Sequence, residues 1–221
     1  MLYASTPLGE ADRFSDIDVL LYFADDRLGE VDPRAWVERI APLDLFYVND
    51  HGIHAAVFEN LVRAEFHFDP ASKMAEIDTW RGLVWFPSAE AAVLLDRTGE
   101  LARRLQAVLA PPPERDTPET AANLANNFLN WYLYGLNVLA RGERARALEA
   151  LNLVHGYLLR MARLRSGSTR HWINAARRLE AEISPEAYAR FAGCTGRLEP
   201  GSPEAAYRAA WRWGVELMRL T

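Results

Sequence analysis

The chain has 221 residues, of which half are hydrophobic and a quarter are charged, a mixture typical of globular proteins that bury a core. Its net charge of −5 and its pI near 5.6 exclude the chain-wide positive field that gathers nucleic acid without sequence preference. Charged residues interrupt the apolar runs well short of the roughly 20 residues that cross a bilayer. We therefore expect no membrane partner.

The N-terminus and the cysteine content favour the cytoplasm. Met1 is followed by Leu-Tyr-Ala-Ser-Thr-Pro, which lacks the basic and apolar regions of a secretory signal. Cys194 is the one cysteine, so the sequence contains neither an intrachain disulfide framework nor a cysteine-based zinc site. Lys73 is the one lysine and ends no glycine-rich loop, which excludes a Walker-type phosphate loop.

Short strand-like segments fill the first half of the chain. Each is rich in Val, Ile, Phe or Tyr and is bounded by Asp, Asn, Gly or Pro, as is typical of β-strands. We predict strands over residues 17–23, 43–48, 53–58, 62–68 and 92–95. Asp32 and Pro33 suit a helix cap and a first helical position, so they predict a helix over residues 33–40. The fold class of residues 1–110 is therefore α/β (α+β), a mixed sheet with flanking helices.

The second half changes to a helical period after the proline-rich segment 111–116, which we interpret as a linker. Thr117 begins and Gly142 ends the first apolar pattern with a period of 3.6 residues. Further helices are predicted over residues 143–165, 172–183, 185–191 and 203–220. Because antiparallel helices joined by short loops pack as a bundle, residues 117–221 are predicted to form a C-terminal helical bundle domain.

Asp16 and Asp18 flank the start of the first predicted strand. Residues two apart share a face of a strand, so the two carboxylates project together while Ile17 and Val19 point into the core. Carboxylates on one face repel each other, and a Mg²⁺ ion between them relieves the repulsion and brings substrate phosphates as further ligands. The alternative is a solvated strand end with two acidic residues.

A small residue and a serine, Ala4-Ser5, precede the two aspartates, with ten residues between Ser5 and Asp16. Residues 7–12 fit a turn and a short helix, at whose N-terminus backbone N–H groups and the Ser5 hydroxyl would hold phosphate. The pattern resembles the nucleotidyltransferase superfamily typified by DNA polymerase β, whose signature is Gly-Ser, roughly ten residues and an Asp-x-Asp pair. This resemblance implies a nucleotidyltransferase-fold sheet and a third carboxylate on a neighbouring strand.

Glu65 is the candidate for that third carboxylate. Strand alternation places Arg63, Glu65 and His67 on one face of the segment 62–68, with apolar residues on the other. The alternative is the polar outer face of an amphipathic strand. Asp44 is the rival third carboxylate, and we assign His67 no role in metal binding.

Residues 12–18, 60–68, 135–143 and 146–149 together resemble the lincosamide nucleotidyltransferases that have an N-terminal nucleotidyltransferase domain and a C-terminal helical domain. The resemblance implies transfer of a nucleoside monophosphate, from ATP or GTP, to a hydroxyl of an antibiotic such as lincomycin or clindamycin. It also implies Asp16 and Asp18 as ligands of Mg²⁺ and Glu65 as the general base.

Other residues are candidates for binding the two substrates. Ser5 and Arg63 would contact the nucleotide, and the helical domain would bind the acceptor. Asn127, Trp131 and Tyr134 on its first helix are the candidate acceptor contacts, since aromatic walls with a few polar anchors suit a sugar joined to an apolar amide. The alternative for these aromatic residues is packing in the core. The large aromatic content also allows a homodimer.

Two departures from the family pattern leave other functions open. Ala4 stands where the family has glycine, and its Cβ disfavours a turn with positive φ. Tyr3 lies two residues from the start, whereas the family has a helix and a strand before this motif, so we expect a shortened sheet edge. The alternatives are a nucleotidyltransferase that acts on an aminoglycoside, a protein or tRNA, and an inactive homologue.

Overall fold

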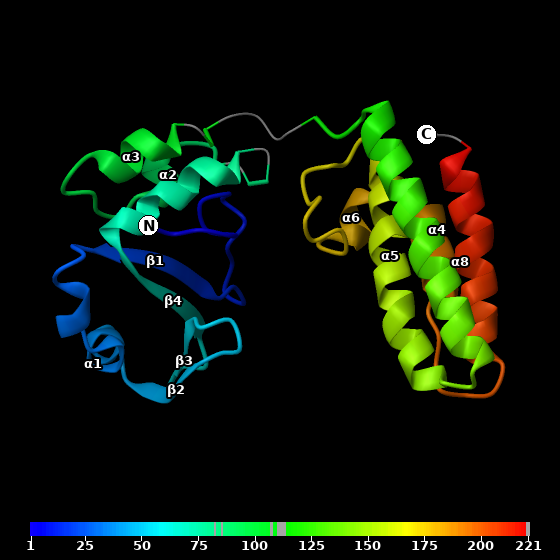
Figure 1. Cartoon of the computed structure of the whole chain (residues 1–221), viewed down its shortest axis with the longest axis horizontal. Coiled ribbons are helices and arrows are strands. Elements are labelled where there is room, and N and C mark those ends of the chain that lie inside the picture. Colours follow the sequence, from blue (N-terminus) through cyan, green and yellow to red (C-terminus); the bar gives the residue numbers. More distant parts are fainter. Residues whose placement is uncertain (82, 85, 107, 110–113, 220–221) are drawn as a thin grey trace. The chain divides into compact units, whose positions relative to one another are not determined.

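The chain consists of two compact units, Met1–Pro113 and Glu114–Thr221, which we call the N-terminal unit and the helical unit (Figure 1). The computed structural model describes residues 1–81, 83–84, 86–106, 108–109 and 114–219. Residues 111–113 of the predicted proline-rich linker lie outside this range. Each unit has its own hydrophobic core and is described separately below.

A mixed sheet of four strands organises the N-terminal unit (Figure 1). Its strands are β1 (Ile17–Phe23), β2 (Leu43–Val48), β3 (His54–Phe58) and β4 (Arg63–Pro70), in the spatial order β1-β4-β3-β2. β4 is parallel to β1 and antiparallel to β3, and β2 is antiparallel to β3. The mixed α/β sheet predicted from the sequence is confirmed.

The prediction of a fifth strand over residues 92–95 is wrong. A short helix, α2 (Ala89–Ala92), ends at that position, and the Ser88 side chain caps it by accepting a hydrogen bond from the backbone N–H of Ala91. Of the apolar residues that suggested a strand, Ala92 is fully buried in a core, whereas Leu94 and Leu95 are exposed. An apolar run this short does not distinguish a strand from a helix end.

One face of the sheet packs against α1 (Pro33–Glu38). Asp32 caps this helix as predicted, accepting a hydrogen bond from the Ala35 N–H at 3.1 Å. Val37 of α1 is fully buried against the apolar side chains that alternate along β1, β3 and β4. Val19 lies in this core as predicted. Ile17 does not: at the first residue of β1, where cover is incomplete, it is 38% exposed.

The opposite face of the sheet is only partly covered. Leu20 and the N-terminal Met1 belong to a second core, which includes residues of η2 (Ala71–Trp80), α2 and α3 (Glu100–Leu105). The Met1 amino group donates to the Leu20 carbonyl at 2.6 Å, and Leu2 forms an antiparallel bridge with Val19. The N-terminal residues thus border β1. A further short helix, η1 (Leu28–Glu30), follows β1.

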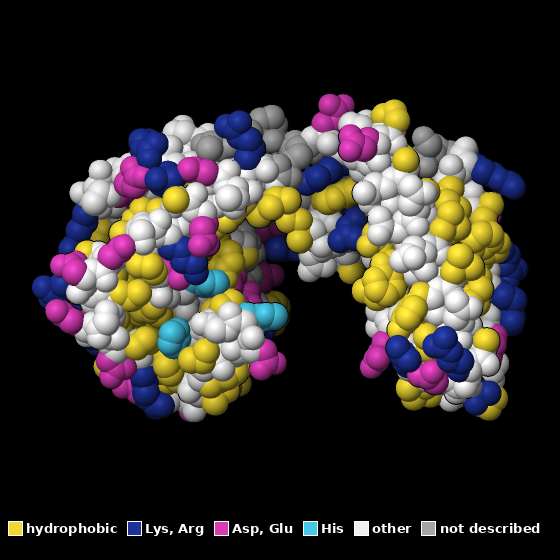
Figure 2. Space-filling view, viewed as in Figure 1, with side chains coloured by type: hydrophobic (Ala, Val, Ile, Leu, Met, Phe, Trp, Pro, Cys, Tyr) yellow, Lys and Arg dark blue, Asp and Glu magenta, His cyan; other side chains and the backbone are white. Residues whose placement is uncertain are grey.

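The helical unit contains two long helices, α4 (Pro118–Ala140) and α5 (Arg144–Ser166), followed by α6 (Leu179–Glu182), α7 (Pro185–Gly193) and α8 (Ser202–Met218). Thr117 caps α4, and the chain turns after it at Gly142 with a φ of 81°, as predicted. Figure 2 shows hydrophobic side chains gathered over α4 and α8 on the visible side of this unit. The predicted end of the last helix at residue 220 lies outside the described residues.

The predicted helix over residues 172–183 is wrong except for its last turn, α6. Arg163 of α5 is fully buried, and its guanidinium donates hydrogen bonds to the carbonyls of Ala175 and Arg177. Arg160 donates similarly to the carbonyl of Trp172 at 3.1 Å. Carbonyls that accept from arginine side chains satisfy their hydrogen bonding outside a helix, so the segment folds as turns around α5.

Close helix contacts in this unit require glycine at two positions. A Cβ added to Gly135 of α4 would lie 1.9 Å from the Tyr207 hydroxyl oxygen, and one added to Gly214 of α8 would lie 2.3 Å from Phe128 Cζ. Tyr207 uses that hydroxyl to donate to the Ala147 carbonyl at 2.7 Å.

Among the helices of the described residues, none is both long enough and apolar enough to cross a membrane.

Candidate active site

The three predicted carboxylates lie on two adjacent strands. Asp18 of β1 is directly in register with Glu65 of β4, and partners in register present their side chains on the same face of a sheet. Asp16 precedes β1 by one residue, two positions from Asp18. It lies beside Arg63 of β4, whose Nη1 is 3.7 Å from Asp16 Oδ2. These residues therefore gather at one place on the partly covered face.

The electrostatics of this cluster are unbalanced towards negative charge. Asp18 is buried, with 8% of its surface exposed. Burial first, and then the carboxylates of Asp16 and Glu65, raise the pKa of Asp18 to about 6, although Arg63 and a hydrogen bond from Tyr3 act in the opposite direction. The ionised cluster is thus less stable than isolated carboxylates in water, and a cation between them would relieve this.

The donor set fits Mg²⁺. Asp16 and Asp18 offer oxygen ligands only, and Mg²⁺ is commonly held by one or two carboxylates together with waters and substrate phosphates. Among the described residues, no group of three or more His, Cys, Asp or Glu side chains is close enough to form a metal site made by protein alone. Two aspartates are suited to a Mg²⁺ ion that takes its remaining ligands from water and a bound nucleotide.

Tyr3, which had no predicted role, contacts the cluster, and His67 in turn contacts Tyr3. The Tyr3 hydroxyl lies 2.9 Å from Nε2 of His67 and also bonds the Asp18 carboxylate. Burial and the nearby carboxylates raise the pKa of Tyr3, and burial lowers the pKa of His67. His67, expected to have no metal role, instead partners a tyrosine. Its place on the Glu65 face was visible in the strand alternation, whereas Tyr3 reaches the site through tertiary contact.

Asn49 also contacts Glu65. It lies at the end of the β2 hairpin, where its Oδ1 accepts hydrogen bonds from the N–H groups of His51 and Ile53, each at 3.0 Å. Its Nδ2 donates a long hydrogen bond of 3.5 Å to Glu65 Oε1. Because the turn fixes the amide, Asn49 restricts the orientation of the Glu65 carboxylate. The sequence signal was an asparagine at the start of the Asn-Asp-His-Gly turn.

The rival carboxylate Asp44 lies far from the cluster. It belongs to β2, at the other edge of the sheet from β1, so three strand spacings of about 4.8 Å separate the two strands. This topology leaves Glu65 as the carboxylate that adjoins the pair.

Ser5 is buried in a turn over residues 4–9, and its carbonyl accepts a hydrogen bond from the Glu10 N–H. Of the turn and short helix predicted over residues 7–12, residues 7–9 form a turn, but no helix follows, because residues 10–12 have no regular structure. Ala4 has a φ of 58°, the left-handed conformation that favours glycine. The phosphate-binding role of Ser5 therefore would depend on a turn rather than on a helix N-terminus, and it stays a prediction.

Comparison with known proteins addresses the helical unit most directly. Residues 117–221 match the family model described as "Lincosamide nucleotidyltransferase-like, C-terminal domain". The helical unit is therefore similar to the C-terminal domain of lincosamide nucleotidyltransferases. No curated protein sequence matches it. A crystal structure of an aminoglycoside 6-adenyltransferase from Bacillus subtilis matches with a TM-score of 0.44 and 13% identity, covering 93% of this chain and 79% of that one. A likeness this distant does not decide the substrate.

The predicted acceptor contacts lie along one side of α4, one helical turn apart. Trp131 and Tyr134 form an edge-to-face pair with ring centroids 5.5 Å apart. Arg146 of α5 donates to the Tyr134 hydroxyl at 2.9 Å, and Asn127 donates from its amide to the Asn123 carbonyl at 2.9 Å. Tyr134 is exposed, whereas Trp131 also packs against the core. The group forms a polar and aromatic strip, and its role in acceptor binding stays a prediction.

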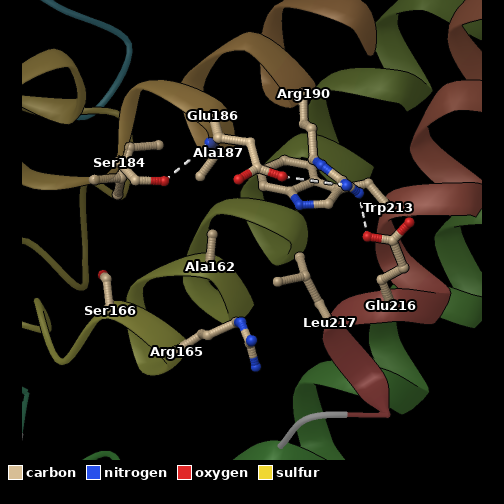
Figure 3. A pocket seen from close by; sticks show the side chains of 11 residues that line it. Ala162, Arg165, Ser166, Ser184, Glu186, Ala187, Arg190, Trp213, Glu216 and Leu217 are labelled. Atoms are coloured by element: carbon tan, nitrogen blue, oxygen red, sulfur yellow. Dashed lines mark hydrogen bonds and ion pairs between the residues drawn. The ribbon is translucent and has the colours of Figure 1, made fainter.

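A pocket of about 420 Å³ lies elsewhere in the helical unit, between the end of α5, the start of α7 and the end of α8 (Figure 3). Trp213 and Leu217 give it an apolar wall. On its rim Arg190 pairs with both Glu186 and Glu216. None of the predicted acceptor residues lines this pocket, so it is separate from the strip on α4.

Proposed function

We propose that this chain is a nucleotidyltransferase, which transfers a nucleoside monophosphate, AMP from ATP, to a hydroxyl of a lincosamide such as lincomycin or clindamycin, with release of pyrophosphate. The register of Asp18 against Glu65, with Asp16 beside them, is the single observation that carries the proposal. It supplies two oxygen ligands and a third carboxylate on one open face. The matched family of the helical unit supports the choice of a lincosamide as acceptor.

Each polar residue of the site has a proposed part in the reaction. Asp16 and Asp18 would hold Mg²⁺, which when bound neutralises negative charge on the triphosphate. Glu65 takes the proton of the acceptor hydroxyl as that oxygen forms a bond to the α-phosphorus. The bond from the α-phosphorus to the oxygen bridging to the β-phosphate breaks, and pyrophosphate carries away the electron pair. Ser5 and Arg63 bind the leaving phosphates.

Neighbouring groups prepare the site for this step. Asn49 donates to one oxygen of Glu65, which leaves the other oxygen available to the acceptor hydroxyl. Tyr3 donates to Asp18 and so favours its ionised form, in which a carboxylate binds metal. The acceptor would also contact Asn127, Trp131 and Tyr134. The proposal includes a cytoplasmic location and a homodimer as the assembly to be tested.

Mass spectrometry after incubation with ATP and Mg²⁺ tests the proposal. Clindamycin and lincomycin are expected to gain the mass of one nucleoside monophosphate residue, whereas kanamycin, a polycationic aminoglycoside, is expected to gain none. Glu65→Gln and Asp16→Asn should abolish the gain while leaving the circular dichroism spectrum unchanged. Asp44→Asn is the matched control, since it neutralises a carboxylate of the same sheet away from the site, and should retain full transfer.

Two outcomes contradict the proposal. Equal turnover by the wild-type chain and Glu65→Gln would remove Glu65 from the reaction. Modification of kanamycin but of neither lincosamide would keep a nucleotidyltransferase and overturn the acceptor.

A further inference from the structure

An irregularity in β2 changes the face on which its later side chains lie. Leu43 pairs with Phe58, but the next pairing joins Leu45 to Val57, so the register shifts between Leu43 and Leu45. In a regular strand these two leucines would share a face. The extra residue of a bulge reverses the alternation. Leu43 therefore packs in the core on the α1 side, whereas Leu45 lies on the opposite face.

That opposite face is the one that carries the candidate active site. Tyr47 pairs with Ala55, Ala55 with Glu65, and Glu65 with Asp18, so one row of side chains crosses all four strands on the same face. Two strand spacings, roughly 10 Å, separate Glu65 from Tyr47. Ala55 lies between them, and its methyl side chain projects less from the sheet than the side chains of Tyr47 and Glu65, which leaves a shallow depression in the row.

Apolar side chains lie next to Ala55 on the side away from Asp18. Leu45 and Tyr47 are each 49% exposed, and Val57 is half-buried. The outward face of a partly covered sheet is usually polar. We call Leu45, Tyr47, Ala55 and Val57 the apolar shelf. It adjoins the catalytic carboxylates directly, because Ala55 is the register partner of Glu65.

We infer that the apolar shelf binds the apolar part of the acceptor, while the hydroxyl to be modified lies at Glu65. The inference rests on the proposed function and adds a specificity determinant in the N-terminal unit. On the other side of Glu65, Asp16 and Asp18 occupy the place suited to the metal and the nucleotide phosphates, so the shelf side remains for the acceptor. Its four side chains carry no charge and so offer no carboxylate to pair with ammonium groups.

The shelf therefore selects amphipathic hydroxyl compounds over polycations. An acceptor that fits has a polar, hydroxyl-bearing part about as far from an apolar part as Glu65 is from Tyr47. Loss of apolar contact weakens binding of such a molecule about tenfold or more, as the removal of even small apolar groups from a binding site does. Nucleotide binding, which lies on the aspartate side, is unaffected.

Calorimetry on the full chain with clindamycin, in the presence of Mg²⁺ and a non-hydrolysable ATP analogue, tests the inference. The double variant Leu45→Ser with Tyr47→Ser removes both exposed side chains and leaves the core residues in place. Val48→Ser is the matched control, because Val48 is exposed on the same strand but pairs with His54 on the opposite face. We expect the double variant to bind clindamycin about tenfold more weakly or worse, and the control to bind like the wild-type chain.

The ATP analogue is titrated separately as the second readout, and its affinity should be equal in all three proteins. Equal clindamycin affinity in all three, or no binding to the wild-type chain, overturns the inference. A parallel loss of nucleotide affinity in the double variant also overturns it, since the shelf would then bind the base. Shelf-dependent binding of clindamycin without any transfer would refute the proposed function and leave the inference standing.

Discussion

Replacing Asp18 by Asn is expected to stabilise the fold while abolishing transfer. Burial of the side chain first, and then the carboxylates of Asp16 and Glu65, raise the pKa of Asp18 from 3.8 to about 6. A folded-state pKa above the unfolded value means that ionisation costs the folded state more than the unfolded chain. That difference corresponds to about 3 kcal/mol at pH 7, when the carboxyl is ionised in both states. Asn keeps the shape and removes the charge.

The expected increase in the free energy of unfolding of Asp18→Asn is smaller than this cost of ionisation. Asn also loses the ionic character of the hydrogen bond with Tyr3, which offsets the gain by about 1 kcal/mol. We therefore expect Asp18→Asn to raise the free energy of unfolding by about 1–2 kcal/mol at pH 7. Below pH 3.8 the carboxyl is protonated in both states, so the gain should disappear as pH falls from 7 through 6 towards 3.8.

Urea unfolding at pH 7 and pH 4, in buffer with a chelator, measures this difference. Asp44→Asn serves as the control and should change the free energy of unfolding at neither pH. The reasoning is refuted if Asp18→Asn is less stable than the wild-type chain at pH 7. It is also refuted if Asp18→Asn exceeds the wild-type chain in free energy of unfolding by the same amount at pH 7 and pH 4. A difference that arises from side-chain packing would not depend on the ionisation of Asp18.

Three further substitutions test the local structure. Ala4→Gly should raise the melting temperature by relieving the positive φ, worth about 0.5–1 kcal/mol. Glu182→Gln should lower the free energy of unfolding by about 3 kcal/mol or more, because fully buried Arg163 loses its carboxylate partner at 2.6 Å. Gly214→Ala should lower it by about 1–3 kcal/mol, because the new Cβ meets Phe128. Urea unfolding measures the last two.

Controls and contrary results are specific to each change. The carboxylate of Glu186 is 79% exposed, so Glu186→Gln should change the free energy of unfolding by less than about 0.5 kcal/mol. A loss in Glu182→Gln as small as that in Glu186→Gln would contradict the importance of the buried pair between Arg163 and Glu182. Gly193→Ala adds a Cβ with nothing within 4 Å and should be tolerated, unlike Gly214→Ala. A lower melting temperature in Ala4→Gly would show that the left-handed turn is not strained.

The hydrogen-bonding partners of Glu182 also make the free energy of unfolding depend on pH in the acidic range. Arg163 and His171 outweigh the effect of burial and lower the pKa of Glu182 to about 2. A folded pKa below the unfolded value of 4.5 means that this stabilisation is present above pH 4.5 and is lost as pH falls towards 2. Acid unfolding followed by circular dichroism should lose this dependence in Glu182→Gln, and an unchanged acid transition would contradict the assignment.

Local sequence signals were sufficient wherever neighbouring residues decide the structure. The Asp32 and Thr117 caps and the turn at Gly142 were predicted because a cap or a positive-φ turn is a property of a few adjacent residues. Period-2 alternation similarly placed Glu65 on the face that it occupies, and the apolar residues of β4 on the other.

Distant contacts explain what the sequence did not predict. The sequence near residues 172–178 does not indicate that Arg163, which lies on α5, donates hydrogen bonds to carbonyls of this segment and so prevents a helix there. Tyr3 and Asn49 reach the carboxylates from the N-terminus and from a hairpin turn, so no spacing along the chain relates them to Asp18 or Glu65. Such contacts depend on the order of the strands, which short motifs do not specify.

The position of a bound divalent ion tests the central claim most directly. Crystals grown with Mn²⁺ and a non-hydrolysable ATP analogue would locate the ion by its anomalous scattering. Our account predicts one strong peak at ligand distance from the carboxylates of both Asp16 and Asp18, on the face of the sheet that carries Glu65. A peak bound elsewhere, with Asp18 left without a metal while the nucleotide is bound, would contradict it.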